Sequence, residues 1–551
     1  MAEKKNYNAQ GKEIEITSSS FEFCQADKKI HDTKFETKPI GYFKDALIRF
    51  CKNRASVAAF VIIIFIVLFA LIVPFTTPSE KATVMDTYYK QKAPRNVFLK
   101  ENLGIMSGSK KLESNERAVL LELAKGVGAE FDEEEEIISL GDSFDSYYQP
   151  VIKYKFAGEN KLGVSSKAFY DMKIDTYLSV GFIYKTIEQS EYRKILEWEQ
   201  ENGKRIIYPL IDTANSYCVD ANNANYWYKA NAKGVPLNVI STGANGRLDT
   251  TKDVDDKKTD DIVELLKFSE DLVLEDNYKR DENGNLVYYT YSGGGSTETA
   301  MYNVRILYYN YYQYINGFEP NYFIGTDSQG YDLAYRMATG IRLSLLLAVV
   351  VSVINLVLGA IVGAIEGYYG GTVDLIIERL KDILSGIPFI ILATLFQLHL
   401  AKKVGPLPSL IFAFVLTGWL GTSSRVRTQF YRFKNQEYVM AARTLGARDR
   451  RIMWKHIFPN TLGTLITSSV LVIPSVIFSE SMLSYLGIAS LGGTKNTSLG
   501  TLLSDASTKW TDFPHLMIAP AIVISLLMIC FNLFGNGLRD AFNPTLRGSE
   551  E

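Results

Sequence analysis

Histidine and cysteine are scarce in this chain of 551 residues, which contains four of each. No histidine occurs in residues 80–320, and this excludes a Ser–His–Asp catalytic site from that long polar region. The histidines are dispersed and the cysteines form no Cys-x-x-Cys pair, so we expect neither a metal site nor a disulfide framework. The polar region, about 240 residues long, must therefore be stabilised by its own core.

The chain also lacks a strong overall charge, since its net charge is −2, and nothing in this balance indicates a nucleic-acid partner. The charges are nevertheless unevenly placed. Residues 80–320 hold 39 Asp and Glu against 29 Lys and Arg, a net charge of −10, whereas the remainder has a net charge of +8. This asymmetry indicates that the two parts face different compartments.

Six apolar segments approach the roughly 20 residues that a helix needs to cross a bilayer. They are Ala55–Pro74, Leu343–Ile365, Ile383–Leu400, Val404–Gly421, Thr461–Phe478 and Leu516–Phe534. The third and fourth are near the lower length limit, and Pro474 predicts a kink in the fifth. We therefore predict an all-α polytopic membrane domain with six transmembrane helices, embedded in the lipid bilayer.

Basic residues in short loops predict the orientation of these helices. Residues 421–460 contain nine Lys and Arg but only two acids, which places this loop in the cytoplasm. Because 54 residues precede the first apolar segment and no small-residue cleavage site follows it, we expect a signal anchor rather than a cleaved signal peptide. The prediction is a multi-pass protein of the plasma membrane with both termini in the cytoplasm.

The chain divides into five predicted parts. Residues 1–39 are polar and are expected to form a flexible cytoplasmic N-terminus. Phe43, Leu47 and Phe50 indicate an amphipathic helix at the inner membrane interface, although a simple extension of the first span is the alternative. The parts are 1–39, then 40–78 with the interfacial helix and first span, 79–320 as an extracellular inserted domain, 321–546 as a transmembrane core containing the loop 421–460, and the tail 547–551.

An α+β fold is predicted for residues 79–320. Ser114–Lys125 and Ser190–Gln200 have apolar faces and turn residues typical of helices, while Arg205–Ile211 and Leu286–Tyr291 are typical of strands. These four segments favour a domain that mixes helices with strands.

The loop after the fourth span has an informative local pattern. Glu437–Leu445 predicts a helix containing the adjacent Ala441 and Ala442, which Gly446 interrupts. A second helix is predicted over Ala447–His456, ended by Pro459. Two interpretations follow from the residues alone: a rigid helical hairpin that acts as a lever, or a basic loop held at anionic lipid headgroups.

This loop resembles the EAA loop of ABC importer permeases, which has the form Glu-Tyr-x-x-Ala-Ala-x-x-x-Gly-Ala followed by His-x-x-Pro-Asn. The matching residues are Glu437, Tyr438, Ala441, Ala442, Gly446, Ala447, His456, Pro459 and Asn460. Four other stretches, 324–345, 367–374, 480–487 and 532–544, resemble the second permease of oligopeptide, dipeptide and nickel importers. The resemblance covers residues 40–78 and 321–546, and the long segment between them departs from the family pattern.

The resemblance implies the type I ABC importer permease fold and no catalysis or bound cofactor in this chain. It implies three kinds of partner: a second permease, two ATP-binding subunits that hold ATP and Mg, and an extracellular substrate-binding protein. The residues expected to couple this chain to an ATPase are Glu437, Tyr438, Ala441, Ala442, Leu445, Gly446, Ala447, Arg450, His456 and Pro459.

A second group of residues is predicted to belong to a gate or pathway. An acid at membrane depth, such as Glu480, is a functional candidate by default, although a structural hydrogen bond to a neighbouring helix is the alternative. Asp327, Arg336 and Arg342 flank the second span, where the two arginines are expected to pair with acids of the inserted domain.

The sequence therefore favours an importer permease for oligopeptides, with dipeptides and nickel chelates left open as cargo. A membrane receptor with an extracellular ligand-binding domain is one alternative. An enzyme that uses a pair of carboxylates in residues 80–320 is another, because acids are plentiful there.

Overall fold

The computed structural model describes residues 42–77, 85–115, 150–162, 165–230, 276–293, 300–489 and 497–542, with the short stretches 6–7, 13–14, 118, 121–122, 125, 239–241, 272–274 and 491. The first two short stretches are the paired strands β1 (Asn6–Tyr7) and β2 (Glu13–Ile14). Otherwise the predicted N-terminus 1–39 and the tail 547–551 lie outside the described residues.

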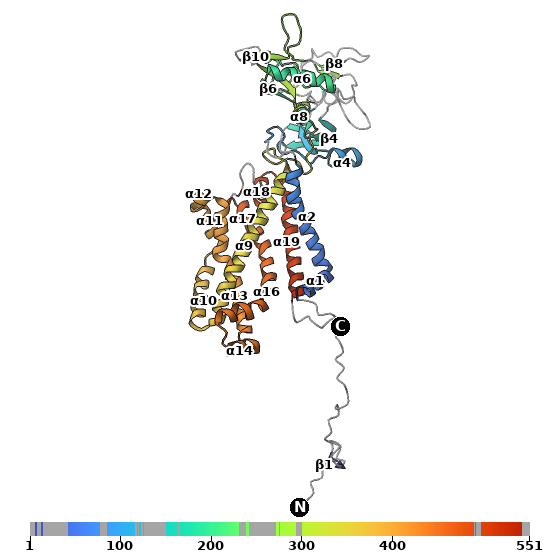
Figure 1. Ribbon diagram of the computed structural model, residues 1–551. Coiled ribbons are helices and arrows are strands. Elements are labelled where there is room, and N and C mark those ends of the chain that lie inside the picture. The colour runs from blue at the N-terminus through green and yellow to red at the C-terminus, as the bar shows by residue number, and fades with distance from the viewer. Residues whose placement is uncertain are drawn as a thin grey trace, which may run out of the picture.

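Long helices form a bundle at the centre of the molecule (Figure 1). Five described helices are long and apolar enough to cross a membrane: Arg54–Thr76, Leu333–Tyr369, Pro406–Phe433, Asp449–Tyr485 and Pro514–Phe542. They comprise α2 (Arg54–Thr76), α9 (Leu333–Tyr369), α13 (Pro406–Phe433), the stretch that ends in α16 (Phe458–Val470) and α17 (Val472–Tyr485), and α19 (Pro514–Phe542). Five of the six predicted spans are thus present, with longer bounds than the apolar runs alone indicated.

The third predicted span is broken rather than straight. It consists of α10 (Gly371–Ser385) and α11 (Phe389–His399), which meet at an angle of 76°, followed by the short α12 (Ala401–Val404). The break falls at Gly386-Ile387-Pro388, where the proline disfavours helical geometry for the residue before it. The prediction of six spans holds only if this bent pair is taken as one span.

The fifth span is interrupted close to Pro474, the residue at which a kink is predicted. α16 ends at Val470 and α17 begins at Val472, so the interruption lies one turn before Pro474. Because Pro474 has no N–H, the carbonyl one turn earlier loses its helical partner, and the helix is interrupted there.

Glycines bring α9 against α13. Gly359, Gly363 and Gly367 recur every fourth residue of α9, and a Cβ atom at Gly363 would lie 2.3 Å from the Ser423 carbonyl oxygen of α13. The other two glycines would clash in the same way with side chains or backbone of α13. This spacing allows the two backbones to approach closely, as small residues do in membrane helix pairs.

At the N-terminal side of the bundle, α1 (Tyr42–Lys52) precedes α2 and packs beside α19. Ala46 and Phe50 are buried against Ala541, while Leu47 is exposed. The predicted amphipathic helix over 40–53 is therefore present, separated from α2 by Asn53, which caps α2.

Residues 85–332 lie between α2 and α9, and we call them the interhelical region. It contains both helices and strands. They are α4 (Val97–Leu103), β3 (Ser109–Asn115), β4 (Val151–Leu162), β5 (Ser165–Asp175), the 3-10 helix η2 (Leu178–Val180), β6 (Phe182–Glu188), α6 (Gln189–Asn202), β7 (Ile207–Tyr208), β8 (Val239–Ser241), β9 (Leu272–Leu274), β10 (Tyr289–Gly293), β11 (Met301–Leu307) and α8 (Tyr308–Asn316).

Two antiparallel sheets dominate this region. One has the strand order β3-β5-β4, and the other has β10-β11-β6 with β7 also paired to β11. The predicted helix over 190–200 is confirmed as α6, but the predicted helix from Ser114 is wrong at its start, because Ser109–Asn115 pairs with β5 along its whole length. The strands predicted at 205–211 and 286–291 are present only in part.

Tyrosines form much of the core of the interhelical region. Tyr89, Tyr177, Tyr309 and Tyr311 are buried, together with Ile195 of α6. Figure 1 shows this region stacked on one end of the helix bundle, which we call the interhelical end. The opposite end carries α14 (Glu437–Thr444), and we call it the α14 end.

Candidate functional site

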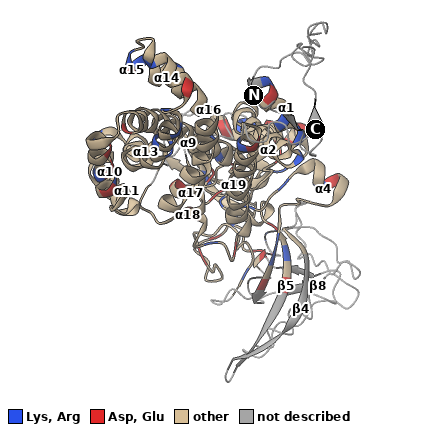
Figure 2. Ribbon diagram, turned by 90° about the horizontal axis from the view of Figure 1, so that it is seen from below, with Lys and Arg blue, Asp and Glu red and all other residues tan. Residues whose placement is uncertain are grey.

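The α14 end is built from a short helical hairpin. α14 is followed by Gly446, whose φ of 78° is a conformation that glycine adopts readily, and then by α15 (Asp449–Arg451). The first predicted helix of the loop is therefore confirmed to within one residue. Figures 1 and 2 show α14 and α15 projecting from the bundle.

The second helix differs from the prediction. It begins at Asp449 rather than at Ala447, continues through the π-helix Ile452–Ile457, and runs directly into α16. Pro459 does not end it but occupies the first turn of α16. A proline is tolerated where its missing N–H is not required, and the wide π turn before it supplies such a position.

The base of this hairpin is fixed to the bundle by apolar packing. Val439, Ile452 and Ile457 are fully buried and share a cluster with Phe430 of α13 and Tyr368 of α9. The hairpin therefore cannot move without moving the ends of α9 and α13, because its base and theirs form one packed core.

The tip of the hairpin has the opposite character. Leu445 is 88% exposed, and Met440 and Tyr438 are also exposed. Arg448, Arg450 and Arg451 are exposed beside them, and Figure 2 shows basic residues on α15. A tip that combines exposed apolar and basic side chains is the composition expected of a protein-binding surface.

All ten predicted coupling residues lie in this one hairpin and the first turn of α16. The exposed ones are Glu437, Tyr438, Ala441, Leu445, Gly446, Arg450 and Pro459, and the half-buried ones are Ala442, Ala447 and His456. The Nδ2 of Asn460 donates to the Tyr438 hydroxyl at 3.1 Å, which joins the two helices of the hairpin. Their role in coupling stays a prediction.

One hydrogen bond connects the hairpin directly to the end of α9. The Tyr368 hydroxyl donates to Oδ1 of Asp449 at 2.6 Å, and the Arg443 guanidinium lies 5.9 Å from the centre of the Tyr368 ring. Tyr368 thus touches both helices of the hairpin at the point where α9 ends.

A charged cluster lies one turn further into the bundle. Lys381 of α10 pairs with the fully buried Glu366 of α9 at 2.8 Å and with Glu378 at 2.5 Å. Arg427 of α13 binds Asp374 of α10 through two nitrogens, at 2.5 and 2.8 Å. The cluster holds three helices together by paired charges rather than by apolar contact alone.

This charged cluster also offers metal-binding geometry. Oxygens of Glu366, Asp374 and Glu378 lie within 4.8 Å of one another. Lys381 and Arg427, however, already supply counter-charges to all three carboxylates. The arrangement is therefore better described as an ion-pair network than as a metal centre.

At the interhelical end, Arg336 pairs with a residue outside the predicted inserted domain. Its Nε lies 3.1 Å from Oδ2 of Asp327, and both side chains are nearly fully buried. Asp327 belongs to the turn that leads into α9, and pairing of Arg336 with an acid of residues 79–320 stays a prediction. Arg342 is exposed.

Glu480 lies in a closed polar contact between helices. It is fully buried in α17, where its carboxylate accepts hydrogen bonds from Ser344 of α9 at 3.0 Å and from Ser484 at 2.9 Å. The helix α18 (Leu499–Ala506) covers this contact, with Gly500 close to Ser481. This geometry fits the alternative, a structural hydrogen bond to a neighbouring helix. A role for Glu480 in a gate stays a prediction.

Comparison with known proteins identifies the chain at the level of its family. Residues 355–548 match the family described as the binding-protein-dependent transport system inner membrane component. Residues 41–94 match the N-terminal transmembrane domain of oligopeptide transport permease C. The oligopeptide transport system permease protein OppC of Bacillus subtilis is 38% identical over 227 residues, which is 41% of this chain and 73% of that protein. The chain belongs to the family of binding-protein-dependent transport system inner membrane components.

Further relatives have the same kind of description. The dipeptide transport system permease protein DppC of Bacillus subtilis is 38% identical over 233 residues, covering 41% of this chain and 70% of that protein. The oligopeptide transport system permease protein OppC of Escherichia coli is 39% identical over 229 residues, covering 41% of this chain and 73% of that protein. The chain is thus a multi-pass membrane component of a transport system, and such a permease is not itself an enzyme.

Sequence reasoning missed two features of this permease. The partners of Glu366 lie on α10 and α13, and only the fold brings Lys381 and Arg427 to it. The link between Tyr368 and Asp449 was missed for the same reason. A usable signal was present, since Glu366 directly follows an uncharged apolar run and its charge needs a partner.

Proposed function

We propose that this chain is one permease subunit of an ATP-driven importer for oligopeptides, and that it supplies half of the translocation pore. The proposal is supported by relatives that are named as oligopeptide and dipeptide transport permeases and are 37–41% identical to it. The observation that carries it is the exposed tip of the hairpin, whose base is packed into the bundle.

The proposed orientation places the α14 end in the cytoplasm. The nine Lys and Arg in residues 421–460 support a cytoplasmic location for this end, since short cytoplasmic loops are enriched in basic residues. Both termini then lie in the cytoplasm of a plasma-membrane protein. Residues 79–320 form an extracellular domain in this arrangement, and 321–546 form the transmembrane core of the type I importer fold.

In the proposed mechanism the hairpin docks onto an ATP-binding subunit through Leu445, Met440 and Tyr438. ATP and Mg are bound by two such partner subunits, and this chain contributes the surface that they push. Closure of the ATPase pair displaces the hairpin, and its packed base transmits the movement to α9 and α13 as a rigid-body change. A second permease and an extracellular substrate-binding protein complete the assembly.

The same movement accounts for the second group of predicted residues. The hydrogen bond between Ser344 and Glu480 joins α9 to α17, so a change of access that separates these helices exposes the Glu480 carboxylate to the pathway. Asp327 and Arg336 hold the other end of α9, and the exposed Arg342 is available to cargo or to a partner.

The test is the substitution Leu445→Asp, with the matched control Leu196→Asp at an exposed leucine of α6. The complex is purified gently from its own membranes, and peptide uptake is measured in cells. We expect Leu445→Asp to abolish both uptake and recovery of the ATP-binding subunits, because a charge at the tip blocks apolar docking, while the control retains both.

Normal uptake by the Leu445→Asp chain, with its ATP-binding subunits still attached, contradicts the proposed docking surface. Recovery of the unsubstituted chain alone, or with signalling proteins, instead favours the receptor alternative. Recovery of a second permease and two ATP-binding subunits supports the importer.

A further inference from the structure

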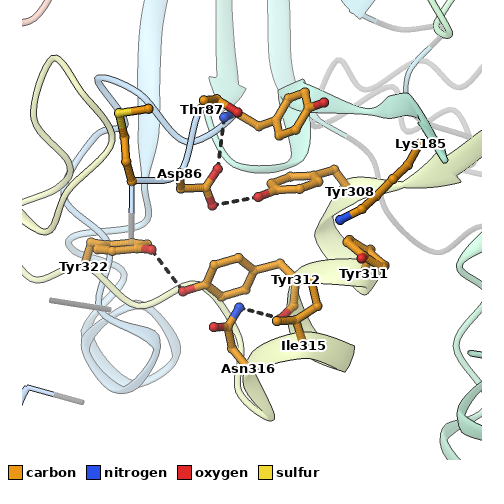
Figure 3. Close-up of a pocket in the computed structure, with 11 residues that line it drawn as sticks. Asp86, Thr87, Lys185, Tyr308, Tyr311, Tyr312, Ile315, Asn316 and Tyr322 are labelled. Carbon is orange, nitrogen blue, oxygen red and sulfur yellow. Dashed lines mark hydrogen bonds between the residues drawn. The ribbon is translucent and has the colours of Figure 1, made fainter. Parts of the chain in front are cut away.

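The interhelical region contains a pocket that the transport mechanism above does not use. Its volume is 280 Å³, and it is lined by residues 85–88, Lys185 of β6, the tyrosine-rich helix α8, and Tyr322 (Figure 3). Ligand sites in proteins are typically about 300–1,000 Å³, so this pocket suits one small group rather than a long chain segment.

The walls of the pocket are aromatic rings whose hydroxyl groups are already bonded. The Tyr308 hydroxyl donates to Asp86 at 2.7 Å, the Tyr311 hydroxyl donates to Glu191 at 3.0 Å, and those of Tyr312 and Tyr322 lie 3.0 Å apart. Burial raises the pKa of Tyr308 and Tyr312, so these phenols remain neutral. The rings therefore present apolar faces and edges to the interior of the pocket.

Two charged residues line the pocket, and their states differ. The carboxylate of Asp86 accepts the backbone N–H groups of Tyr88 and Tyr89 at 2.9 and 3.0 Å in addition to the Tyr308 hydroxyl. Both of its oxygens thus already accept hydrogen bonds, three in all. The Asp86 carboxylate is therefore a poor partner for an incoming amino group.

The Lys185 ammonium, by contrast, makes no such hydrogen bonds within the described residues. Its ammonium lies 4.1 Å from the centre of the Tyr311 ring, and within the described part of the chain it has no hydrogen bond or ion pair. Partial burial lowers the pKa of Lys185, although Glu191 and Asp86 oppose this effect. Figure 3 shows the lysine reaching toward Tyr308 and Tyr311, so its three N–H donors face the aromatic cavity, where within the described residues none of them is hydrogen-bonded.

We propose that this pocket binds the C-terminal end of a peptide, with the carboxylate on Lys185 and an apolar or aromatic last side chain between the tyrosine rings. A partly desolvated ammonium favours an anion, and aromatic walls favour a flat apolar group. The small volume selects the end of a peptide over its middle. This inference rests on the proposed function for the choice of a peptide as the ligand.

The pocket adjoins the start of the pore helix α9. Gly330, two residues before the α9 cap Asp332, has a φ of 96°, and a Cβ atom there would lie 1.9 Å from the backbone oxygen of Asp86. The floor of the pocket and the turn into α9 are thus in direct backbone contact. A peptide end held by Lys185 is placed next to the entry of the predicted pathway.

The experiment uses the full chain in lipid nanodiscs, without ATP-binding subunits or substrate-binding protein. The probes are the tripeptide Ala-Ala-Phe with a free C-terminus and the same tripeptide as its C-terminal amide, and binding is measured by equilibrium dialysis. We expect the amide to bind about tenfold more weakly, because it loses the charge-assisted hydrogen bond.

Three variants sharpen the test. Lys185→Met should weaken binding of the free acid about tenfold and leave binding of the amide unchanged, since only the acid uses the charge. Lys185→Arg should retain most of the affinity. Lys194→Met, at an exposed lysine of α6, should have no effect.

Equal affinity for acid and amide in the unsubstituted chain overturns the inference, as does unchanged acid binding by Lys185→Met. Absence of tripeptide binding to a chain whose assembled transporter still imports the tripeptide overturns the pocket and leaves the proposed function standing. Failure of the assembled transporter to import any peptide overturns the proposed function instead.

Discussion

The two ends of α9 are held by different kinds of contact. At the interhelical end, Asp327 and Arg336 form a buried pair, and the second oxygen of Asp327 accepts backbone N–H groups from Gln329 and Tyr331, each at 2.9 Å. At the α14 end, the Tyr368 ring packs in the apolar base of the hairpin, and its hydroxyl donates one hydrogen bond to the exposed Asp449.

The difference separates an anchor from a movable joint. A buried ion pair costs about 3–5 kcal/mol when one partner is removed, because the remaining charge is stranded. A hydrogen bond to an exposed group contributes only about 0.5–1.5 kcal/mol. Under the proposed function, the first end keeps α9 in place and the second exchanges contacts as the ATPases move.

Between these ends, α9 is stiffened by its contact with α13. The glycines at every fourth position leave no space for the two helices to slide past each other without separation. Under the proposed function, we therefore expect movement applied to Tyr368 to pass along α9 toward Ser344 and Glu480.

The largest predicted effect follows from removing the anchor. Arg336→Met strands the buried Asp327 carboxylate and should lower the free energy of unfolding by about 3–5 kcal/mol, measured by thermal unfolding of the purified chain. Arg342→Met, on the same helix but exposed, should change it by less than about 0.5 kcal/mol. Equal losses in the two variants would show that the buried pair is not what distinguishes this end.

A second prediction concerns Lys92, which lies beside the anchor, and the way its charge makes stability depend on pH. The backbone N–H of Lys92 donates to Oγ1 of Thr326 at 2.8 Å beside the turn into α9, and burial lowers the pKa of the Lys92 side chain to about 8. At pH 7 Lys92 is charged in both the folded and the unfolded state, so burial of its ammonium lowers the free energy of unfolding by the largest amount. As the pH rises above about 8 the folded state releases the proton first, and stability increases.

Lys92→Met should therefore stabilise the chain by about 3 kcal/mol at pH 7, and this advantage should shrink at pH 9.5. The measurement is thermal unfolding at the two pH values, with the exposed Lys90→Met as the control. An advantage of the same size at both pH values would mean that the gain comes from apolar packing rather than from relief of a buried charge.

The sequence predicted the local features of this molecule better than the contacts between distant segments. α14 and Gly446 follow from helix propensity and a glycine turn, both local properties. The break at Gly386–Pro388 does not follow from hydropathy, because it lies inside an apolar run of 18 residues that is long enough to predict one straight span. Local sequence predicts a helix at Ser114, whereas the strand there depends on pairing with the distant Tyr170 of β5.

The same limit applies to the candidate sites. Lys185 and Tyr311 are separated by more than a hundred residues, and the pocket they share follows only from the pairing of β6 with β11 and the helix after it. The Glu366 network likewise depends on the packing of three helices. Residue types indicated which charges need partners, but not which partners the fold supplies.

The smallest predicted effect on stability tests the movable joint. Tyr368→Phe removes one hydrogen bond and should lower the free energy of unfolding by about 1 kcal/mol or less. In the assembled importer, however, we expect the ATP hydrolysed per peptide imported to rise several-fold, because apolar packing alone then joins the hairpin to α9. The neighbouring exposed Tyr369→Phe is the matched control. An unchanged ratio of ATP to peptide in Tyr368→Phe would mean that the packed base alone transmits the movement, and that the two ends of α9 differ in stability but not in function.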